Sequence, residues 1–490
     1  QVEDPKLAEG VVKRDVVRIV TPGTIIDDKV VDIKSNNNIL SIVETDDSAY
    51  TAFCDISTGE FHFCTMKKDE FMRGVISHII KISPSEVIVE SSSYGSYLEG
   101  GAELLSSVKR LLPELAFNHI DDWKGDSRYC EDQLLSHLGI NTLKASGFEN
   151  EGEIRAAGIL LSYLKETQKS SLLHIRRMTP QRELEHMFLD LYTQLNLDIL
   201  PARGGPNLFD ILDLNQTPMG SRLLKKRLMR PLLDVEAIQA RLDIVEELTN
   251  YDTLELEETL KRIKDIERIL SKISLGVVKP PELLVLRAGL EVFPQVFSFV
   301  GVLDSVLGKA MAADMEASKS HIEKTSEFLL SAISDSPPVV SNDTGIFREG
   351  YDAELDHLRD ISKNGKGIIK GILEELKAKL NVPGIKLGYN RIHGYYFELS
   401  KLKLNEIELP PEIIRKQTLV NSERFITPEL KEREEEILTV DEKIKSRERT
   451  LWAEALSFFE PYYDELSKYC SVVGRIDLYT ALKNCAQKYY

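Results

Sequence analysis

A series of apolar residues spaced seven apart, late in the 490-residue sequence, constrains the fold more than any other feature. Its members are Leu430, Ile437, Ile444, Leu451 and Phe458. A seven-residue apolar repeat is typical of a long helix that packs along a second helix. Pro461 follows and should kink or end the helix, because proline lacks the backbone N–H that a helix interior needs. The pattern predicts one arm of a helical pair.

The partner arm is expected at residues 354–380. Apolar residues recur there on one helical face, namely Leu358, Ile361, Ile368, Ile372 and Leu376. Gly365, Gly367 and Gly371 should weaken this helix locally, since glycine is a poor helix former. An arm of about 27 residues reaches roughly 40 Å at 1.5 Å per residue. Whatever joins the arms should therefore lie far from the body.

The joining segment, residues 382–426, reads as a small β-rich module. It contains the strand-like runs GYYFELS and QTLVN, separated by Pro410-Pro411. Between residues 384 and 424 it carries seven lysines and arginines against five glutamates. The whole chain has a formal net charge of −17, so its surface as a whole repels nucleic acid. Any contact with DNA must come from a local basic patch such as this one.

Two polar clusters stand out in the joining segment. The first surrounds His393 in the stretch YNRIHGYY, and a lone histidine without a second ligand at metal spacing favours a hydrogen-bonded or phosphate-facing role. The second cluster consists of residue types that contact phosphate oxygens, namely Lys416, Gln417, Thr418, Asn421 and Arg424. On composition alone, a solvated surface and a DNA contact remain alternatives.

The sequence before the arms divides in two. Residues 16–150 alternate strand-like runs with turns, and Asp55-Ile-Ser-Thr-Gly59 is a hairpin signal, which predicts a mixed α/β module. From about residue 153 the pattern is helical. Threonine-proline pairs at residues 179–180, 217–218 and 427–428 predict helix starts. Asp234 should cap a helix whose packing face is formed by Ile238, Leu242 and Val245.

Composition excludes several classes. Five cysteines in no C-x-x-C spacing argue against disulfides and zinc and predict buried free thiols. The most apolar stretch, residues 283–302, is interrupted by charges and proline and predicts no membrane segment. Residues 1–14 lack the apolar region of a signal peptide.

The sequence bears on two kinds of enzyme. No G-x-x-x-x-G-K-[ST] motif is present, so the chain alone is expected to hydrolyse no ATP. Asp55, Glu60 and Asp69 could form a two-metal nuclease cluster. Turn and surface carboxylates explain them better, because turns select aspartate on conformational grounds.

Five segments resemble, in order and spacing, the signature segments of the MutS family of DNA mismatch repair proteins. They are VRIVTPGT (17–24), LDLNQTPMGSRLLKKRLMRPLLD (212–234), DIERIL (265–270), YNRIHGYYFELS (389–400) and RKQTLVNSERFITPELKE (415–432). Arg475-Ile476 depart from the family, in which an acidic residue and a leucine are more usual. The resemblance spans nearly the whole chain.

The resemblance implies the domain plan. A linker (1–15) would precede a connector domain of ribonuclease-H-like fold (16–145). A helical core or lever domain would follow (150–353) and resume at the end (428–490), with a β-rich clamp and its ascending arm inserted at 354–427. The family's mismatch-reading domain and ATPase domain are expected to be absent from this chain.

The resemblance also implies function and partners. The clamp would grip the backbone of double-stranded DNA through Lys386, Asn390, Arg391, His393, Lys416, Gln417, Thr418, Asn421 and Arg424. The parent would be a DNA-dependent ATPase that uses ATP and magnesium, forms a homodimer or heterodimer, and meets a MutL-type partner through the connector. It would be cytoplasmic in a bacterium or archaeon, and nuclear or organellar in a eukaryote. The alternatives are a relative that clamps branched DNA and a helical protein-interaction scaffold.

Overall fold

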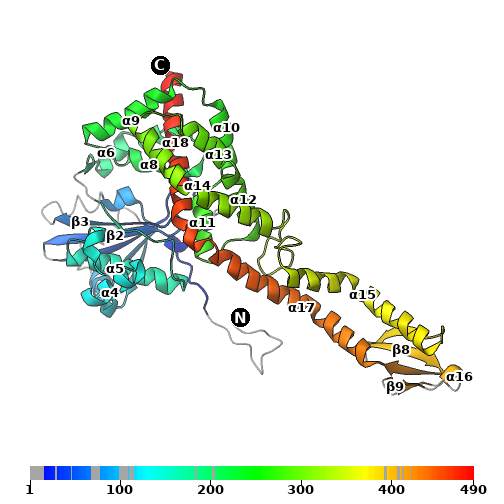
Figure 1. The fold of residues 1–490 in the computed structure, drawn as a ribbon. Coiled ribbons are helices and arrows are strands. Elements are labelled where there is room, and N and C mark those ends of the chain that lie inside the picture. Colours follow the sequence, from blue (N-terminus) through cyan, green and yellow to red (C-terminus); the bar gives the residue numbers. More distant parts are fainter. Residues whose placement is uncertain are drawn as a thin grey trace. The chain divides into compact units, whose positions relative to one another are not determined.

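The computed structural model describes residues 16–27, 30–45, 47–67, 78–98, 109, 115–181, 185–200, 205–390, 394–404, 409–410, 413–419 and 421–489. The chain forms two compact units, whose elements are drawn in Figure 1. Unit 1 comprises Gln1–Val278, Glu282–Phe328 and Phe458–Tyr490, and unit 2 comprises Lys279–Pro281 and Leu329–Ser457.

Unit 1 begins with an α/β module built on a six-stranded sheet of order β5-β4-β1-β2-β3-β6. The strands are β1 (Asn38–Glu44), β2 (Ser48–Asp55), β3 (Glu60–Lys67), β4 (Glu86–Glu90), β5 (Ala116–Ile120) and β6 (Thr179–Pro180). β1, β2 and β3 pair in antiparallel fashion, whereas β4 runs parallel to β1 and to β5, and β6 runs parallel to β3. The mixed α/β class expected for this region is confirmed.

The hairpin between β2 and β3 lies where the sequence predicts it. The Asp55 carboxylate accepts hydrogen bonds from the backbone N–H (2.8 Å) and the hydroxyl (2.6 Å) of Ser57. Gly59 has a φ of +77°, and a Cβ there would lie 2.8 Å from the backbone oxygen of His174. The turn therefore requires its aspartate and its glycine for conformational reasons.

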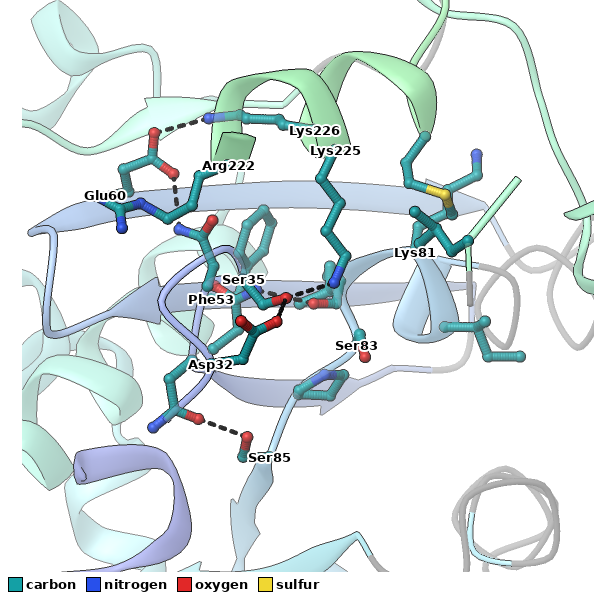
Figure 2. Close-up of a pocket in the computed structure, with 18 of the residues that line it drawn as sticks. Asp32, Ser35, Phe53, Glu60, Lys81, Ser83, Ser85, Arg222, Lys225 and Lys226 are labelled. Carbon is teal, nitrogen blue, oxygen red and sulfur yellow. Dashed lines mark hydrogen bonds and ion pairs between the residues drawn. The ribbon is translucent and has the colours of Figure 1, made fainter. Parts of the chain in front are cut away.

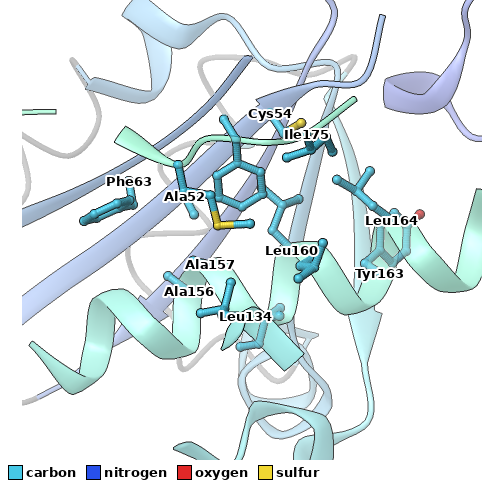
Figure 3. Packing of buried hydrophobic residues seen from close by; sticks show 14 of the residues in the cluster. Ala52, Cys54, Phe63, Leu134, Ala156, Ala157, Leu160, Tyr163, Leu164 and Ile175 are labelled. Carbon is cyan, nitrogen blue, oxygen red and sulfur yellow. The ribbon is translucent and has the colours of Figure 1, made fainter. Parts of the chain in front are cut away.

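Both faces of the sheet are buried. On one face, helix α5 (Glu151–Gln168) packs Ala156, Ala157 and Leu160 against the strands, as Figure 3 shows, with α4 (Ser127–Leu138) beside it. Another cluster contains Val87 and Val89, while Ile88 joins the α5 cluster, as alternation along β4 requires. The module therefore reaches beyond the predicted boundary at residue 145. The boundary was placed too early because the helical pattern of α5 does not reveal that this helix packs on the sheet.

The remaining elements of unit 1 are helical. They are α6 (Leu191–Asn196), α7 (Leu208–Leu212), α8 (Pro218–Leu228), α9 (Val235–Leu248), α10 (Leu254–Arg262), α11 (Ile266–Ser274), α12 (Pro280–Glu291), α13 (Phe293–Val300), α14 (Val306–Ala332) and α18 (Tyr463–Tyr489), of which α12 and α14 extend into unit 2; α2 (Ser91–Leu98) belongs to the α/β module. Helix α18 packs against α8, α9, α10 and α11. We call these helices the helical body.

Two of the three threonine-proline caps are confirmed. Thr217 caps α8 and Thr427 caps α17 (Pro428–Ser457), each through its hydroxyl oxygen. The third prediction is wrong. Thr179 and Pro180 form strand β6, and the Thr179 hydroxyl hydrogen-bonds to Nδ1 of His62 (2.6 Å), because the edge of β3 offers it a partner.

The apolar face predicted for α9 is also wrong, although Asp234 caps this helix as expected. Ile238 and Leu242 are exposed to 37% and 55%. Ile244 and Leu248 are the buried residues of this helix. Helical spacing alone gave two candidate faces, and the packing of α18 against the other face decides between them.

The sequence predicts no membrane segment, but one stretch passes a test of length and composition for a membrane-spanning helix. Pro280–Val300 is long and apolar enough by length and composition to cross a membrane, and 44% of its window is buried within the protein. Here it forms two helices, α12 and α13, and Leu283 and Leu286 are fully buried. The core helices of soluble proteins pass the same test, so length and composition alone are weak evidence for a membrane span here.

Unit 2 contains the predicted pair of arms. Helix α15 (Ala353–Leu380) packs along α17, and Figure 1 shows a small sheet at one end of the pair. The seam residues Leu358, Ile361, Ile372, Leu430, Ile444 and Leu451 are buried, while the side chains of Ile368 and Ile437 lie outside the described part. Helix α17 ends at Ser457, and a short 3-10 turn containing Pro461 precedes α18, as predicted.

Candidate nucleic-acid interface

The small sheet of unit 2 brings part of the predicted site together. It consists of β7 (Lys386–Asn390), β8 (Gly394–Ser400), β9 (Ile414–Thr418) and β10 (Ser422–Ile426) in the order β7-β8-β10-β9, with the short helix α16 (Lys401–Leu404) after β8. Of the strand predicted at QTLVN, Gln417 and Thr418 belong to β9, Leu419 and Asn421 lie outside the strands, and Val420 is not among the described residues. Edge strand β7 was not predicted, because its sequence KLGYN alternates too briefly.

The strand register lines up a polar row across the sheet. Lys386 lies opposite Glu398, Glu398 opposite Arg424, and Arg424 opposite Gln417. Residues directly opposite each other in antiparallel strands share a face. Three members of this row are predicted site residues, and Glu398 is one that the sequence analysis did not select.

The other face of the sheet is apolar and holds it in place. Phe397, Leu399 and Phe425 alternate with the polar row and are buried in one cluster with Ile372 and Leu373 of α15. Because this face packs on the arm, the polar row is turned outward.

Arg424 is fully engaged within the polar row. Its Nε lies 3.2 Å from a carboxylate oxygen of Glu398, and its Nη1 donates to the side-chain oxygen of Gln417 (2.9 Å). Its guanidinium stacks 4.3 Å from the centre of the Tyr396 ring. A Cβ at Gly388 would lie 2.6 Å from that ring, so the glycine leaves room for Tyr396. The charge of Arg424 is therefore balanced within the sheet.

Lys416 has a different environment. A register shift between Arg424 and Phe425 leaves Lys416 without a residue opposite it on β10. Such a register shift leaves a residue outside the regular pairing of the two strands. Lys416 is exposed, as are Lys386, Thr418 and Asn421. In the part of unit 2 that the structure describes, these four side chains make no hydrogen bond or ion pair.

The rest of the predicted first segment is not placed. Arg391 and His393 lie outside the described residues, and Asn390 is described only through its backbone at the end of β7.

The described carboxylates of the possible two-metal nuclease cluster have structural partners. Asp55 is buried and accepts hydrogen bonds from the turn and from the backbone N–H of Asn37 (3.1 Å). Glu60 pairs with Lys226 of α8 (2.9 Å), and the positive charge of Lys226, opposed by burial, holds the pKa of Glu60 at about 2. Asp69 lies outside the described residues. Among the residues described, no three histidines, cysteines or carboxylates are grouped to hold a metal.

A cavity of about 910 Å³ in unit 1 is lined by residues of the α/β module and of α8. Figure 2 shows Lys226 reaching Glu60, and Lys225 reaching the hydroxyl of Ser35 (2.5 Å). Arg222 donates to the carbonyl oxygen of Ile33, in the segment before β1, and to both oxygens of Asp265 (2.9 Å for Ile33, 2.6 and 2.9 Å for Asp265). These cations hold the two parts of unit 1 together, which gives the cavity a structural explanation. All five cysteines are buried free thiols, as predicted.

Comparisons with known proteins agree over nearly the whole chain. The family model of MutS domain III matches residues 192–482, that of MutS domain II residues 37–176, and that of MutS domain I residues 1–29.

Curated relatives give the same picture. The chain is 35% identical to a DNA mismatch repair protein MutS of Methanosarcina barkeri, over 99% of this chain and 55% of the relative. It is 36% identical to that of Caldicellulosiruptor bescii (98% and 53%) and 32% identical to that of Clostridioides difficile (99% and 50%). The chain thus spans about half the length of the relatives it matches.

Proposed function

We propose, because this chain belongs to the MutS family of DNA mismatch repair proteins, that the small sheet of unit 2 grips the backbone of duplex DNA. The observation that carries the proposal is Lys416. It is exposed, has no residue opposite it on β10, and makes no ion pair among the described residues.

Three further polar side chains of the small sheet and its turns support this role. Lys386, Thr418 and Asn421 are exposed and unpaired in the described part of the sheet. Lysine, threonine and asparagine side chains are among the usual donors to phosphate oxygens. Since the whole chain carries a net charge of −17, attraction to DNA has to act locally. Asn390, Arg391 and His393 belong to the same proposed surface.

Arg424 and Gln417 act differently in this proposal. The guanidinium is already paired with Glu398 and stacked on Tyr396, so it contributes mainly by holding β8, β9 and β10 together. Lys416 supplies the charge, and Arg424 keeps the surface in shape.

For the whole protein we propose the family's organisation. The α/β module would be the ribonuclease-H-like connector that meets a MutL-type partner, and the protein would act as a dimer in the cytoplasm. ATP and magnesium would act in a part of the protein beyond domains I to III. No Walker-type phosphate loop occurs in these residues, and we expect the purified chain to hydrolyse no ATP.

The test is a titration of the chain with matched and mismatched duplexes at several salt concentrations. We expect Lys416→Ala to weaken binding to all sequences alike and to lower the salt slope by about one phosphate contact. Asn421→Ala should weaken binding with little change of slope, because it carries no charge. Arg424→Ala should change the slope less than Lys416→Ala does.

Lys324→Ala is the matched control, since Lys324 is an exposed lysine on α14 and its loss changes the net charge equally. It should bind as the wild type does. Wild-type affinity that ignores salt, or Lys416→Ala binding no worse than the control, would refute the proposed grip. A helical protein-interaction scaffold without DNA affinity would then describe this chain better.

A further inference from the structure

A buried carboxylate lies at the base of the two arms. Glu448 of α17 is only 1% exposed. It accepts hydrogen bonds from the backbone N–H of Gly345 (2.9 Å to each oxygen) and of Ile346 (3.2 Å). Arg359 of α15 donates to it through Nη2 (2.7 Å). One carboxylate thus binds three partners from two other segments.

These contacts join α17 to the loop before α15 and to α15 itself. Arg359 also donates to the carbonyl oxygen of Phe347 in that loop (3.0 Å), so the loop is held from both sides. Next to Glu448, Arg447 donates to both carboxylate oxygens of Asp352 (3.0 and 2.6 Å). Asp352 in turn caps the first turn of α15 by accepting from the N–H of Leu355. The start of α15 is therefore tied to α17.

Farther along, the arms pack through buried apolar residues such as Ile372 and Leu430, and the described polar contact between them is exposed. Ser362 and Asp441 make an exposed hydrogen bond of 3.3 Å. Gly367 and Gly371 of α15 bring no side chains to the pair, and a Cβ at either would meet nothing within 4 Å. Of the polar contacts described between the arms, the buried ones at the base therefore do more to fix how the two helices pair than the exposed one beyond them.

We propose that Glu448 is a positioning residue for DNA binding, in that it fixes the pairing of α15 with α17 and so presents the small sheet. This inference rests on the proposed function. A chain without this carboxylate keeps every side chain that would touch DNA but samples more arrangements of the arms. Its apparent affinity falls in proportion to the time spent in the productive arrangement. The number of phosphates contacted, and hence the salt slope, stays the same.

The experiment combines DNA titration with a distance measurement that needs no DNA. Spin labels on Glu375→Cys of α15 and Glu432→Cys of α17 report the separation of the arms by pulsed electron paramagnetic resonance. Both positions are exposed, and the five native cysteines are buried, so labelling is selective. Glu448→Ala is compared with Glu448→Gln, which keeps the shape and loses the charge. Asp441→Ala, which removes an exposed contact of the same helix, is the control.

We expect Glu448→Ala to broaden the distance distribution and to weaken duplex binding about tenfold at an unchanged salt slope. Glu448→Gln should give a smaller effect in the same direction, and Asp441→Ala none. If circular dichroism shows that Glu448→Ala has lost its helices, Glu448→Gln carries the test.

The two failures are distinguishable. A wild-type chain that does not bind duplex DNA overturns the proposed function, whatever the labels report. A wild-type chain that binds, with both Glu448 variants binding equally well or keeping a narrow distribution, overturns the role of Glu448 alone. A reduced salt slope in Glu448→Ala also overturns it, because that result means lost phosphate contacts.

Discussion

Arg424 and Lys416 lie on neighbouring strands, yet their surroundings give them different chemistry. Arg424 has a carboxylate, an amide oxygen and an aromatic ring as partners, whereas Lys416 faces solvent. Composition selected both as candidate phosphate contacts. Composition could not separate the two residues, because their difference arises from the register, which sets Glu398 opposite Arg424 and leaves Lys416 without a partner on β10.

We expect Arg424→Ala to destabilise the small sheet. The guanidinium side chain is 20% exposed, and removing its hydrogen bonds and its stacking on Tyr396 should cost about 1–2 kcal/mol. Hydrogen exchange of the β8 and β10 amides should speed up accordingly. Lys416→Ala should leave that exchange unchanged. Equal exchange in both variants would contradict the distinction drawn between these residues.

His174 gives the α/β module a dependence on pH. Its ring is 3% exposed, and Nε2 bonds to the carbonyl oxygen of Ile56 (3.0 Å). Burial lowers the pKa of His174 from 6.5 to about 4. The neutral ring is therefore favoured in the folded state. Its contribution to stability is complete above pH 6.5 and is lost as the pH falls from 6.5 towards 4.

The α/β module should consequently become less stable between pH 6.5 and 4. The shift corresponds to at most about 3 kcal/mol for His174. His174→Gln, which keeps an N–H donor, should flatten part of this dependence in urea unfolding monitored at each pH. Part should remain, since burial also lowers the pKa of His62 to about 4. A variant with the full wild-type dependence would exclude His174 as a source.

At the scale of elements, sequence pattern was most informative where one contact repeats many times. The seven-residue repeat of α17, the facing pattern of α15 and the break at Pro461 are all observed. The sequence pattern gave wrong predictions where tertiary contacts decide between two possible local structures or two possible buried faces. Thr179 pairs with a strand instead of starting a helix, and α9 buries the face that α18 covers. Helix α5 belongs to the sheet although its own periodicity is that of any helix.

The place of α5 gives a prediction about fragments. A fragment of residues 16–181 should fold by itself, whereas residues 16–145 should not, because the latter lacks the helix that buries Ala156, Leu160 and Leu164 against the strands. Far-UV circular dichroism and the cooperativity of thermal unfolding distinguish the two. A cooperative transition in the shorter fragment would show that α5 is dispensable.

At the scale of the whole molecule, Leu329–Ser457, the longer of the two segments of unit 2, is an insertion whose two ends meet. The rings of Phe328 and Phe458, on either side of the insertion, stack with centroids 3.9 Å apart. The polypeptide thus leaves and re-enters unit 1 at one place. Unit 2 has its own apolar core in the small sheet and its own charged contacts around Glu448.

A fragment of residues 329–457 should therefore fold alone and bind duplex DNA. We expect helical circular dichroism, a cooperative thermal transition, and a salt slope equal to that of the full chain, because the proposed phosphate contacts all lie in this unit. A fragment that folds but does not bind would place the DNA contacts in unit 1. A fragment without a cooperative transition would show that unit 2 depends on unit 1 for stability.

The insertion also has a consequence for the order in which the protein takes shape during synthesis. Helices α8 to α11 precede unit 2 in the chain, yet they pack on α18, which follows it. A ribosome adds about 5–20 residues each second, so these helices wait many seconds for their partner while the whole of unit 2 emerges. Unit 2 can therefore complete its folding before unit 1, although the synthesis of unit 1 begins first. During that interval the apolar faces of α8 to α11 are open to chaperones.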